Sequence, residues 1–376
     1  MSHKNKPKAH ARIDEAQVVR ALVPFLLVPL AYLIALNVPN QTARYETLYA
    51  LGINKWVNQL LSLITGTLKF SLAELILYAH VVAAPVVAII LLGKLFKGGF
   101  FKSALRVLQY ASILYVAFMV LWGFNYGRMS IADMMGFETR PYSKEELISL
   151  NMHLIEQANQ LRQLQEEDAE NVMTHRGDYK DVFNRARLGY EKLGTTVKAL
   201  SGPYGKPKPV FASNLMLYTG ITGVYFPYTA EANVNIAIPA MMLPATTLHE
   251  MAHQRGIAPE DEANFIAYAT AMAHPDKDFK YSGTVLALIH SMNALYRQDP
   301  EQAMALRATY GEGLNRDMVS YSQFWKAYEG KTNEVAEKVN DTYLKSNRQE
   351  DGVRSYGRMV DLLLGYYLSN AIIGTL

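Results

Sequence analysis

The long apolar runs of the chain lie almost entirely in residues 1–125. Three of them, residues 18–38, 72–92 and 105–124, approach the roughly 20 residues that a helix needs to cross a bilayer. Between the first two, residues 53–68 repeat apolar positions at helical spacing and carry polar residues on the other faces, which predicts a helix lying in the membrane interface. We therefore expect a membrane region with three transmembrane helices.

After this region the pattern becomes that of a soluble, mainly helical domain. Ser143 and Glu146 form a capping-box signature ahead of an apolar stripe, and a second helix is expected after Asp178. The remaining helical segments are expected near residues 245–255, 260–273, 282–298, 300–310, 315–329, 332–346 and 355–373.

A short stretch between these helices favours β-structure. Gly and Pro residues precede apolar runs at 210–218 and 224–228, which predicts a hairpin. Residues 232–238 alternate apolar and polar side chains, which is typical of a half-buried or edge strand. The predicted fold class is therefore α+β and mainly helical, with N-terminal transmembrane helices and a small sheet in a domain over residues 126–376.

Composition supports this division and narrows the chemistry. Hydrophobic residues make up 50% of the chain and the mean hydropathy is close to zero, between the values of soluble proteins and membrane bundles. The net charge of +3 comes without a block of Lys and Arg interleaved with aromatics, so nucleic acid is not an expected partner. Because the chain has no cysteine, any metal site needs His and carboxylate ligands.

Basic residues predict the orientation in the membrane. They cluster in the N-terminal tail and after the second span, at Lys4, Lys6, Lys8, Arg12, Lys94, Lys97, Lys102 and Arg106. The positive-inside rule assigns both clusters to the cytoplasm, and three spans then place the following domain outside it. We expect a multi-pass protein of the cell membrane, with the lipid bilayer as a partner and no oligomeric state predicted.

An HExxH motif, His249-Glu250-Met-Ala-His253, occupies one of the predicted helices. A spacing of four places both imidazoles on one helix face, where they can bind Zn²⁺. Glu250 can then act as general base toward the water that the metal activates. The alternative is a helix that carries two histidines and a glutamate on a partly solvated face.

A catalytic zinc site has a third protein ligand. Residues 256–259 predict a chain reversal before a helix that opens with Glu260, Asp261 and Glu262. Glu262 shares an apolar stripe, where a buried acid needs a partner, so we predict Glu262 as the third ligand and Glu260 as the next candidate. All three acids could instead only favour the helix N-terminus. Asn264 is a candidate for a hydrogen bond to a ligand.

Peptide hydrolysis also needs a donor for the oxyanion and a place for the substrate. Tyr281 is the predicted catalytic donor, with His290 as a second candidate. The strand at 232–238 could accept a peptide as an added strand, if its edge is free. A peptide or protein is the expected substrate.

Several segments resemble a bacterial membrane family of unknown function that has N-terminal spans and an HExxH domain. They are the stretch 243–256, Glu262-Ala-Asn-Phe, Tyr281-Ser-Gly and the segments 122–128 and 356–361. This resemblance implies a zincin-like zinc peptidase. Glu262-Ala-Asn is also similar to a helix of the ImmA/IrrE-type metallopeptidases, and that similarity implies Glu262 as the third ligand.

The sequence thus predicts a membrane-anchored zinc metallopeptidase with an extracytoplasmic catalytic domain. The main alternative is a non-catalytic membrane sensor or scaffold whose zincin-like domain binds metal or peptides. A protease with its HExxH motif inside a membrane span is disfavoured. Residues 236–248 are too few to cross a bilayer and contain Pro239 and Pro244.

Overall fold

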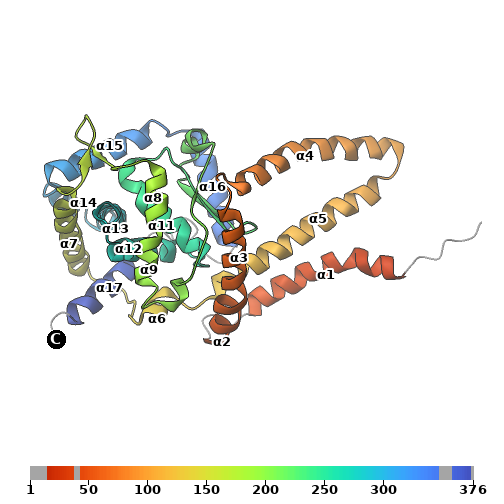
Figure 1. Ribbon diagram of the computed structural model, residues 1–376, viewed down its shortest axis with the longest axis horizontal. Coiled ribbons are helices and arrows are strands. Elements are labelled where there is room, and N and C mark those ends of the chain that lie inside the picture. The colour runs from red at the N-terminus through yellow and green to blue at the C-terminus, as the bar shows by residue number, and fades with distance from the viewer. Residues whose placement is uncertain (1–14, 38–42, 347–357, 374–376) are drawn as a thin grey trace, which may run out of the picture. The chain divides into compact units, whose positions relative to one another are not determined.

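The computed structural model describes residues 15–37, 43–346 and 358–373, and it is mainly helical with two small sheets (Figure 1). Contacts divide the chain into two units. The smaller unit comprises Met1–Val38 and Val81–Val120, and the larger unit comprises Pro39–His80 and Leu121–Leu376. The helical content and the small sheets agree with the predicted α+β class.

The smaller unit holds α1 (Glu15–Asn37), most of α4 (Leu72–Lys97) and most of α5 (Phe100–Leu121). Two stretches, Leu72–Lys97 and Phe100–Gly127, are long and apolar enough to cross a membrane, in agreement with the second and third predicted spans. The first predicted span coincides with α1, whose described apolar stretch is shorter, at Leu22–Leu36. The basic tail that predicted the orientation lies outside the described residues.

The larger unit is a body of helices around α13, which Figure 1 views nearly end-on. Its helices are α2 (Ala43–Tyr45), α3 (Lys55–Gly66), α6 (Ile131–Met135), α7 (Lys144–Arg162), α8 (Tyr179–Arg185), α9 (Arg187–Leu193), α10 (Ser213–Met216), α11 (Leu243–Gln254), α12 (Glu260–Ala273), α13 (Lys277–Gln298), α14 (Pro300–Arg307), α15 (Glu312–Lys326), α16 (Lys331–Ser346) and α17 (Met359–Ile373). A π-helix, η1 (Glu46–Asn54), precedes α3, and the 3₁₀ helices are η2 (Gly123–Gly127), η3 (Lys198–Leu200), η4 (Leu217–Thr219) and η5 (Ala240–Met242).

Several predicted helix boundaries are confirmed. The side chain of Ser143 accepts a hydrogen bond from the backbone N–H of Glu146, and the full capping box starts α7. The helix expected after Asp178 is split at Ala186 into α8 and α9. Residues 355–357 of the last predicted helix lie outside the described residues. α7, α11, α12, α14 and α17 pack on α13, so the core of the larger unit lies directly behind the HExxH helix.

A three-stranded sheet lies against α11. β5 (Glu231–Val234) is its central strand, parallel to β3 (Lys208–Pro209) and antiparallel to β4 (Gly223–Phe226). A separate pair joins β1 (Glu166–Glu167) to β2 (Met173–Thr174). The predicted hairpin between 210–218 and 224–228 is wrong, since β4 pairs with β5. Residues 213–219 form α10 and η4, and the apolar residues there, at 215–218, are consecutive rather than alternating as in a half-buried strand.

The helix predicted at residues 53–68 is present as the end of η1 and α3, and it belongs to the larger unit. Its polar side chains face that unit, as the buried Asn58, Ser62 and Thr65 illustrate. Thr65 Oγ1 donates a 3.1 Å hydrogen bond to the carbonyl oxygen of Thr229. The compact unit that contains the HExxH motif therefore also includes residues 39–80, whereas the sequence predicted a boundary at residue 125.

Candidate metal centre

The helix that carries the HExxH motif, α11, is almost entirely buried. Pro244 stands in its first turn, where a missing N–H costs nothing, and the helix ends before Gly256. Gly256 has φ +80°, and a Cβ there would lie 2.8 Å from Nη1 of Arg128. Both the left-handed conformation and the close packing require glycine at this position. The predicted reversal after the motif is thus confirmed.

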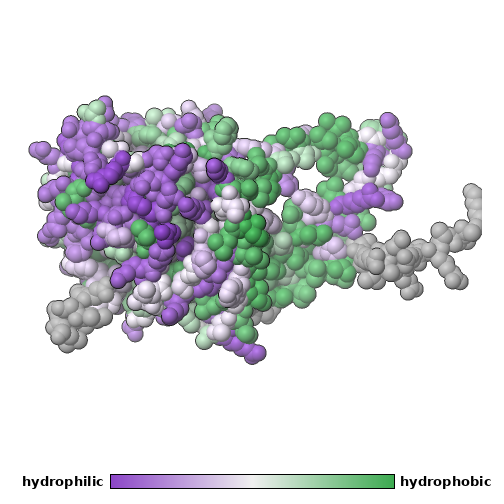
Figure 2. All heavy atoms as spheres, viewed as in Figure 1, coloured by the Kyte–Doolittle hydropathy of each residue, from purple (hydrophilic) through white to green (hydrophobic). Residues whose placement is uncertain are grey.

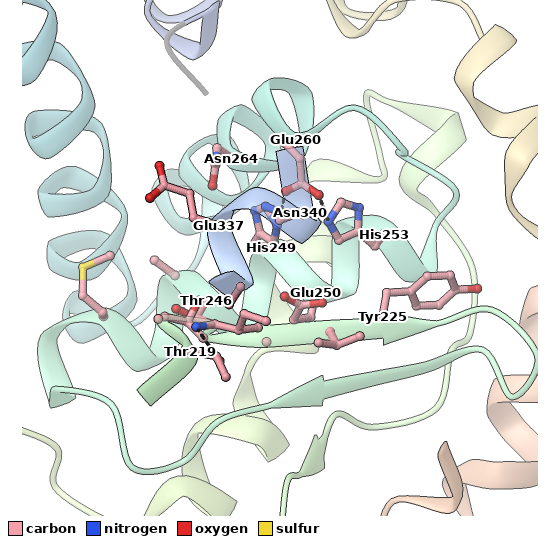
Figure 3. Close-up of a pocket in the computed structure, with 18 of the residues that line it drawn as sticks. Thr219, Tyr225, Thr246, His249, Glu250, His253, Glu260, Asn264, Glu337 and Asn340 are labelled. Carbon is pink, nitrogen blue, oxygen red and sulfur yellow. Dashed lines mark hydrogen bonds and ion pairs between the residues drawn. The ribbon is translucent and has the colours of Figure 1, made fainter. Parts of the chain in front are cut away.

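The reversal brings the first residue of α12 onto the two histidines (Figure 3). Nε2 of His249 lies 3.2 Å from Oε2 of Glu260, and Nε2 of His253 lies 3.6 Å from Oε1 of the same carboxylate. In a tetrahedral zinc site with bonds of about 2.0–2.1 Å, ligand atoms stand about 3.3 Å apart. The donor set and its spacing therefore fit a metal ion.

Hydrogen bonding and charge support the same use of these side chains. The ring Nδ1 of His253 lies 2.7 Å from the carbonyl oxygen of Ile257, so its proton is donated there and Nε2 faces Glu260. Burial alone would lower the pKa of His253, but the adjacent Glu260 carboxylate raises it to about 9. The pKa of Glu260 is well below its usual range, despite its burial, because of the two imidazoles. The negative charge of Glu260 thus favours a cation between the two imidazoles and the carboxylate.

Glu262, the predicted third ligand, lies elsewhere. Its Oε1 accepts a 3.0 Å hydrogen bond from the backbone N–H of Ile131, in the first turn of α6. Burial, reinforced by the neighbouring Asp261, raises the pKa of this carboxyl to about 8. Two residues along a helix turn the side chain by about 200°, so Glu260 and Glu262 face opposite ways. The structure brings Glu260, the second candidate, to the histidines.

Glu250 lies beside this cluster under strand β4. Burial raises the pKa of its carboxyl to about 7, although His249 and His253 oppose the shift. Its Oε2 is buried and has no hydrogen-bond partner among the described residues. A Cβ on Gly223 would lie 2.4 Å from Oε1 of Glu250, so only glycine allows β4 to pass this close.

The cluster opens into a cleft of about 720 Å³. Asn264, one turn after Glu260, and His290 on α13 both line it, as predicted for residues near the site. Tyr281 does not. Its ring is fully buried in the core, and its hydroxyl donates a 2.6 Å hydrogen bond to Oδ2 of Asp317 on α15. The prediction of Tyr281 as the catalytic donor is therefore wrong, because its face of α13 points into the core.

Two further elements contribute residues that the sequence did not single out for the site. The indole ring of Trp122 meets the ring of His253 edge-on, with centroids 5.4 Å apart, and its Nε1 donates a 2.8 Å hydrogen bond to the hydroxyl of Tyr343. Tyr343 and Asn340 come from α16, which forms a wall of the cleft (Figure 3). No local motif in α16 marks these side chains, because only the tertiary packing brings them to α11.

A family model described as "Protein of unknown function (DUF3810)" matches residues 49–364. The chain belongs to this family. The DUF3810 match includes α3, both helices that could cross a membrane and the whole metal cluster. No curated protein and no solved structure matches the chain. The similarity to ImmA/IrrE-type metallopeptidases stays a prediction, since the DUF3810 match carries no link to them.

Proposed function

We propose that this protein is a membrane-anchored zinc metallopeptidase. The observation that carries this proposal is the placement of His249, His253 and Glu260 within ligand distance of one another, with Glu250 beside them in the same cleft. Two histidines and one glutamate are the ligand set of several zinc hydrolases, and they leave a coordination position for water.

The roles of the side chains follow from their positions. A zinc ion held by the three ligands would activate water and polarise the carbonyl of the substrate. Glu250 has a carboxylate oxygen without a protein partner and a pKa near neutrality, so it is suited to take the proton of the attacking water and pass it to the leaving amine. The side chain of Trp122 packs against His253 and limits the movement of that ligand.

The substrate edge differs from the one predicted. β5 ends at Val234 and is paired on both sides, by β3 and β4, so the strand within the predicted 232–238 segment offers no free edge. β4 lines the cleft and has no second neighbouring strand within the described ranges. The carbonyl oxygen of Thr222 accepts a hydrogen bond from the backbone N–H of Asn235. In an antiparallel pair every second residue bonds the partner strand, so the backbone N–H and C=O groups of Gly223 and Tyr225 point away from β5. An extended peptide can pair there, in the cleft that Glu250 also lines.

Tyr343 is our candidate for the donor to the oxyanion. It lines the cleft, and its hydroxyl accepts a hydrogen bond from Trp122, whose ring packs against His253. Burial raises the pKa of the Tyr343 hydroxyl, and the negative charge of Glu260 adds a smaller contribution in the same direction. A neutral hydroxyl can donate a hydrogen bond to a developing negative charge.

The second candidate function is a non-catalytic sensor or scaffold with a structural metal. Structural zinc sites usually close all four positions with protein ligands. Within the described residues the cluster contains three, and Glu250, the proposed general base, lines the same cleft. This observation favours the hydrolase.

Digestion of a peptide library by the full-length protein in detergent tests the proposal. We expect cleavage by the wild type and a loss of about 10²–10⁴-fold in Glu250→Gln, which keeps the metal ligands and lacks the base. Equal cleavage by the two proteins would refute Glu250 as the base, and cleavage by neither would favour the sensor or scaffold.

A further inference from the structure

The amphipathic helix α3 turns its apolar side away from the protein. Trp56, Leu60 and Ile64 are 71%, 61% and 59% exposed, whereas the polar side chains of the helix are buried against the larger unit. In a soluble domain the apolar face of such a helix packs inward. Figure 2 shows the resulting hydrophobic band along α3.

A second segment, about 150 positions later in the chain, has the same character. Phe211 and Leu215 are 91% and 72% exposed, and with Tyr218 they recur at the spacing of one helix face. These residues belong to α10 and its flanks. We call Trp56, Leu60, Ile64, Phe211 and Leu215 together the apolar face.

Buried charged groups fix the elbow between α3 and α4. Lys208, which is 3% exposed, donates from Nζ to the carbonyl oxygens of Thr65 and Leu68 at the end of α3. Glu231, which is 1% exposed, accepts hydrogen bonds from the first backbone N–H groups of α4, those of Leu72 and Ala73. The end of α3 is therefore held on β3 and the start of α4 on β5, both in the sheet beside the HExxH helix.

A second carboxylate connects the start of α4 to the second apolar segment. The side chain of Glu74 accepts hydrogen bonds of 2.7 and 2.9 Å from the backbone N–H groups of Phe211 and Ala212. The two halves of the apolar face are thus both tied to the first turns of α4. As a whole, α4 is a 26-residue apolar helix that is long enough to cross a membrane.

We propose that the apolar face is a membrane-contact surface, immersed in the interfacial layer of the bilayer that α4 enters. Its occupant is lipid, because the face is continuous with the start of a helix whose apolar length matches a bilayer. Trp and Phe at such a boundary, with the exposed Lys69 at the elbow, are typical of side chains that anchor a protein at headgroup level. This surface does not depend on the proposed hydrolysis.

The absence of cysteine from the natural chain allows a direct test, with one cysteine introduced at a time. Leu60→Cys, Phe211→Cys and Leu215→Cys are labelled with a fluorophore in full-length protein reconstituted into phosphatidylcholine–phosphatidylglycerol nanodiscs. Ile89→Cys within α4 is the lipid-exposed control, and Met304→Cys on α14, which is 58% exposed, is the water-exposed control.

Quenching by nitroxide-bearing lipids and by aqueous iodide is then compared at the five positions. We expect labels at positions 60, 211 and 215 to be quenched by the lipid nitroxide at least half as strongly as the label at 89, and by iodide several-fold less than the label at 304. Iodide quenching at 211 and 215 equal to that at 304 would overturn the proposal. Protection of both positions from both quenchers would overturn it too, and would indicate a protein partner or a second copy.

Discussion

At the scale of single residues, the metal cluster depends on which face of α12 meets α11. The pair His249 and His253 could be predicted because a helical spacing of four is a local property of the sequence. The third ligand could not, because the apolar stripe that includes Glu262 indicates the core side and not the cleft side. Glu260 reaches the histidines only through the reversal at Gly256.

Matched glutamine substitutions separate the two carboxylates. Loss of a side chain that hydrogen-bonds to a metal ligand costs about 10–100-fold in metal affinity. Glu260→Gln should weaken zinc binding by more than this, since it removes a charged ligand. Glu262→Gln should leave zinc binding unchanged, because an amide oxygen can still accept the hydrogen bond from Ile131. Competition with a chromogenic chelator measures both affinities. The opposite order would restore Glu262 as the ligand.

Two tyrosines provide a second matched pair. Tyr343→Phe removes the proposed donor and should lower kcat by about 10²–10³-fold with zinc content unchanged. Tyr281→Phe should keep kcat and lower the free energy of unfolding by about 1–3 kcal/mol, because Asp317 loses a buried hydrogen bond. Peptide turnover and thermal unfolding distinguish the two effects. A kcat loss confined to Tyr281→Phe would contradict these assignments.

At the scale of elements, strand β4 defines the proposed substrate site. The β-character of 224–228 was predictable from its composition, but its partner was not, because pairing with β5 depends on the turn between them and on α10 replacing the expected strand. The contribution of α16 to the cleft was also not predictable. The sequence of an amphipathic helix indicates which of its faces is apolar, but not which part of the protein that helix packs against.

The close approach of β4 to Glu250 can be tested by adding a single methyl group at Gly223. In Gly223→Ala the added Cβ conflicts with the Glu250 carboxylate, and a displacement of about 1 Å should cost about 10²-fold in kcat. Zinc content should stay unchanged. Gly330→Ala is the control, since no atom lies within 4 Å of its added Cβ. Equal turnover of both variants would remove β4 from the active site.

At the scale of the whole molecule, the unit with the metal cluster also contains the start of α4, a helix that could cross a membrane. The apolar segment ending at Tyr218 is followed at once by Thr219 and Gly220, which line the cleft. The separation of the long apolar helices from the helical domain could be predicted from hydropathy. The inclusion of 39–80 in the larger unit could not, because the polar side of α3 is buried by distant residues.

This arrangement predicts a preference for substrates near the membrane. In proteoliposomes, a peptide attached to lipid through a short linker should be cleaved at least several-fold faster than the same peptide in solution at equal bulk concentration, because tethering raises its effective concentration at the cleft. The control is the same pair of peptides with detergent-solubilised enzyme, where the difference should disappear. Equal rates in proteoliposomes would contradict the prediction.

The most direct measurement of the central claim is reconstitution of the chelator-stripped, full-length protein with zinc. The account predicts that peptidase activity of the wild type rises linearly up to one equivalent of Zn²⁺. Glu250→Gln should bind the same equivalent and stay inactive, because its ligands remain and its base is lost. Full activity of the stripped protein, or zinc-dependent activity of Glu250→Gln equal to that of the wild type, would contradict the account.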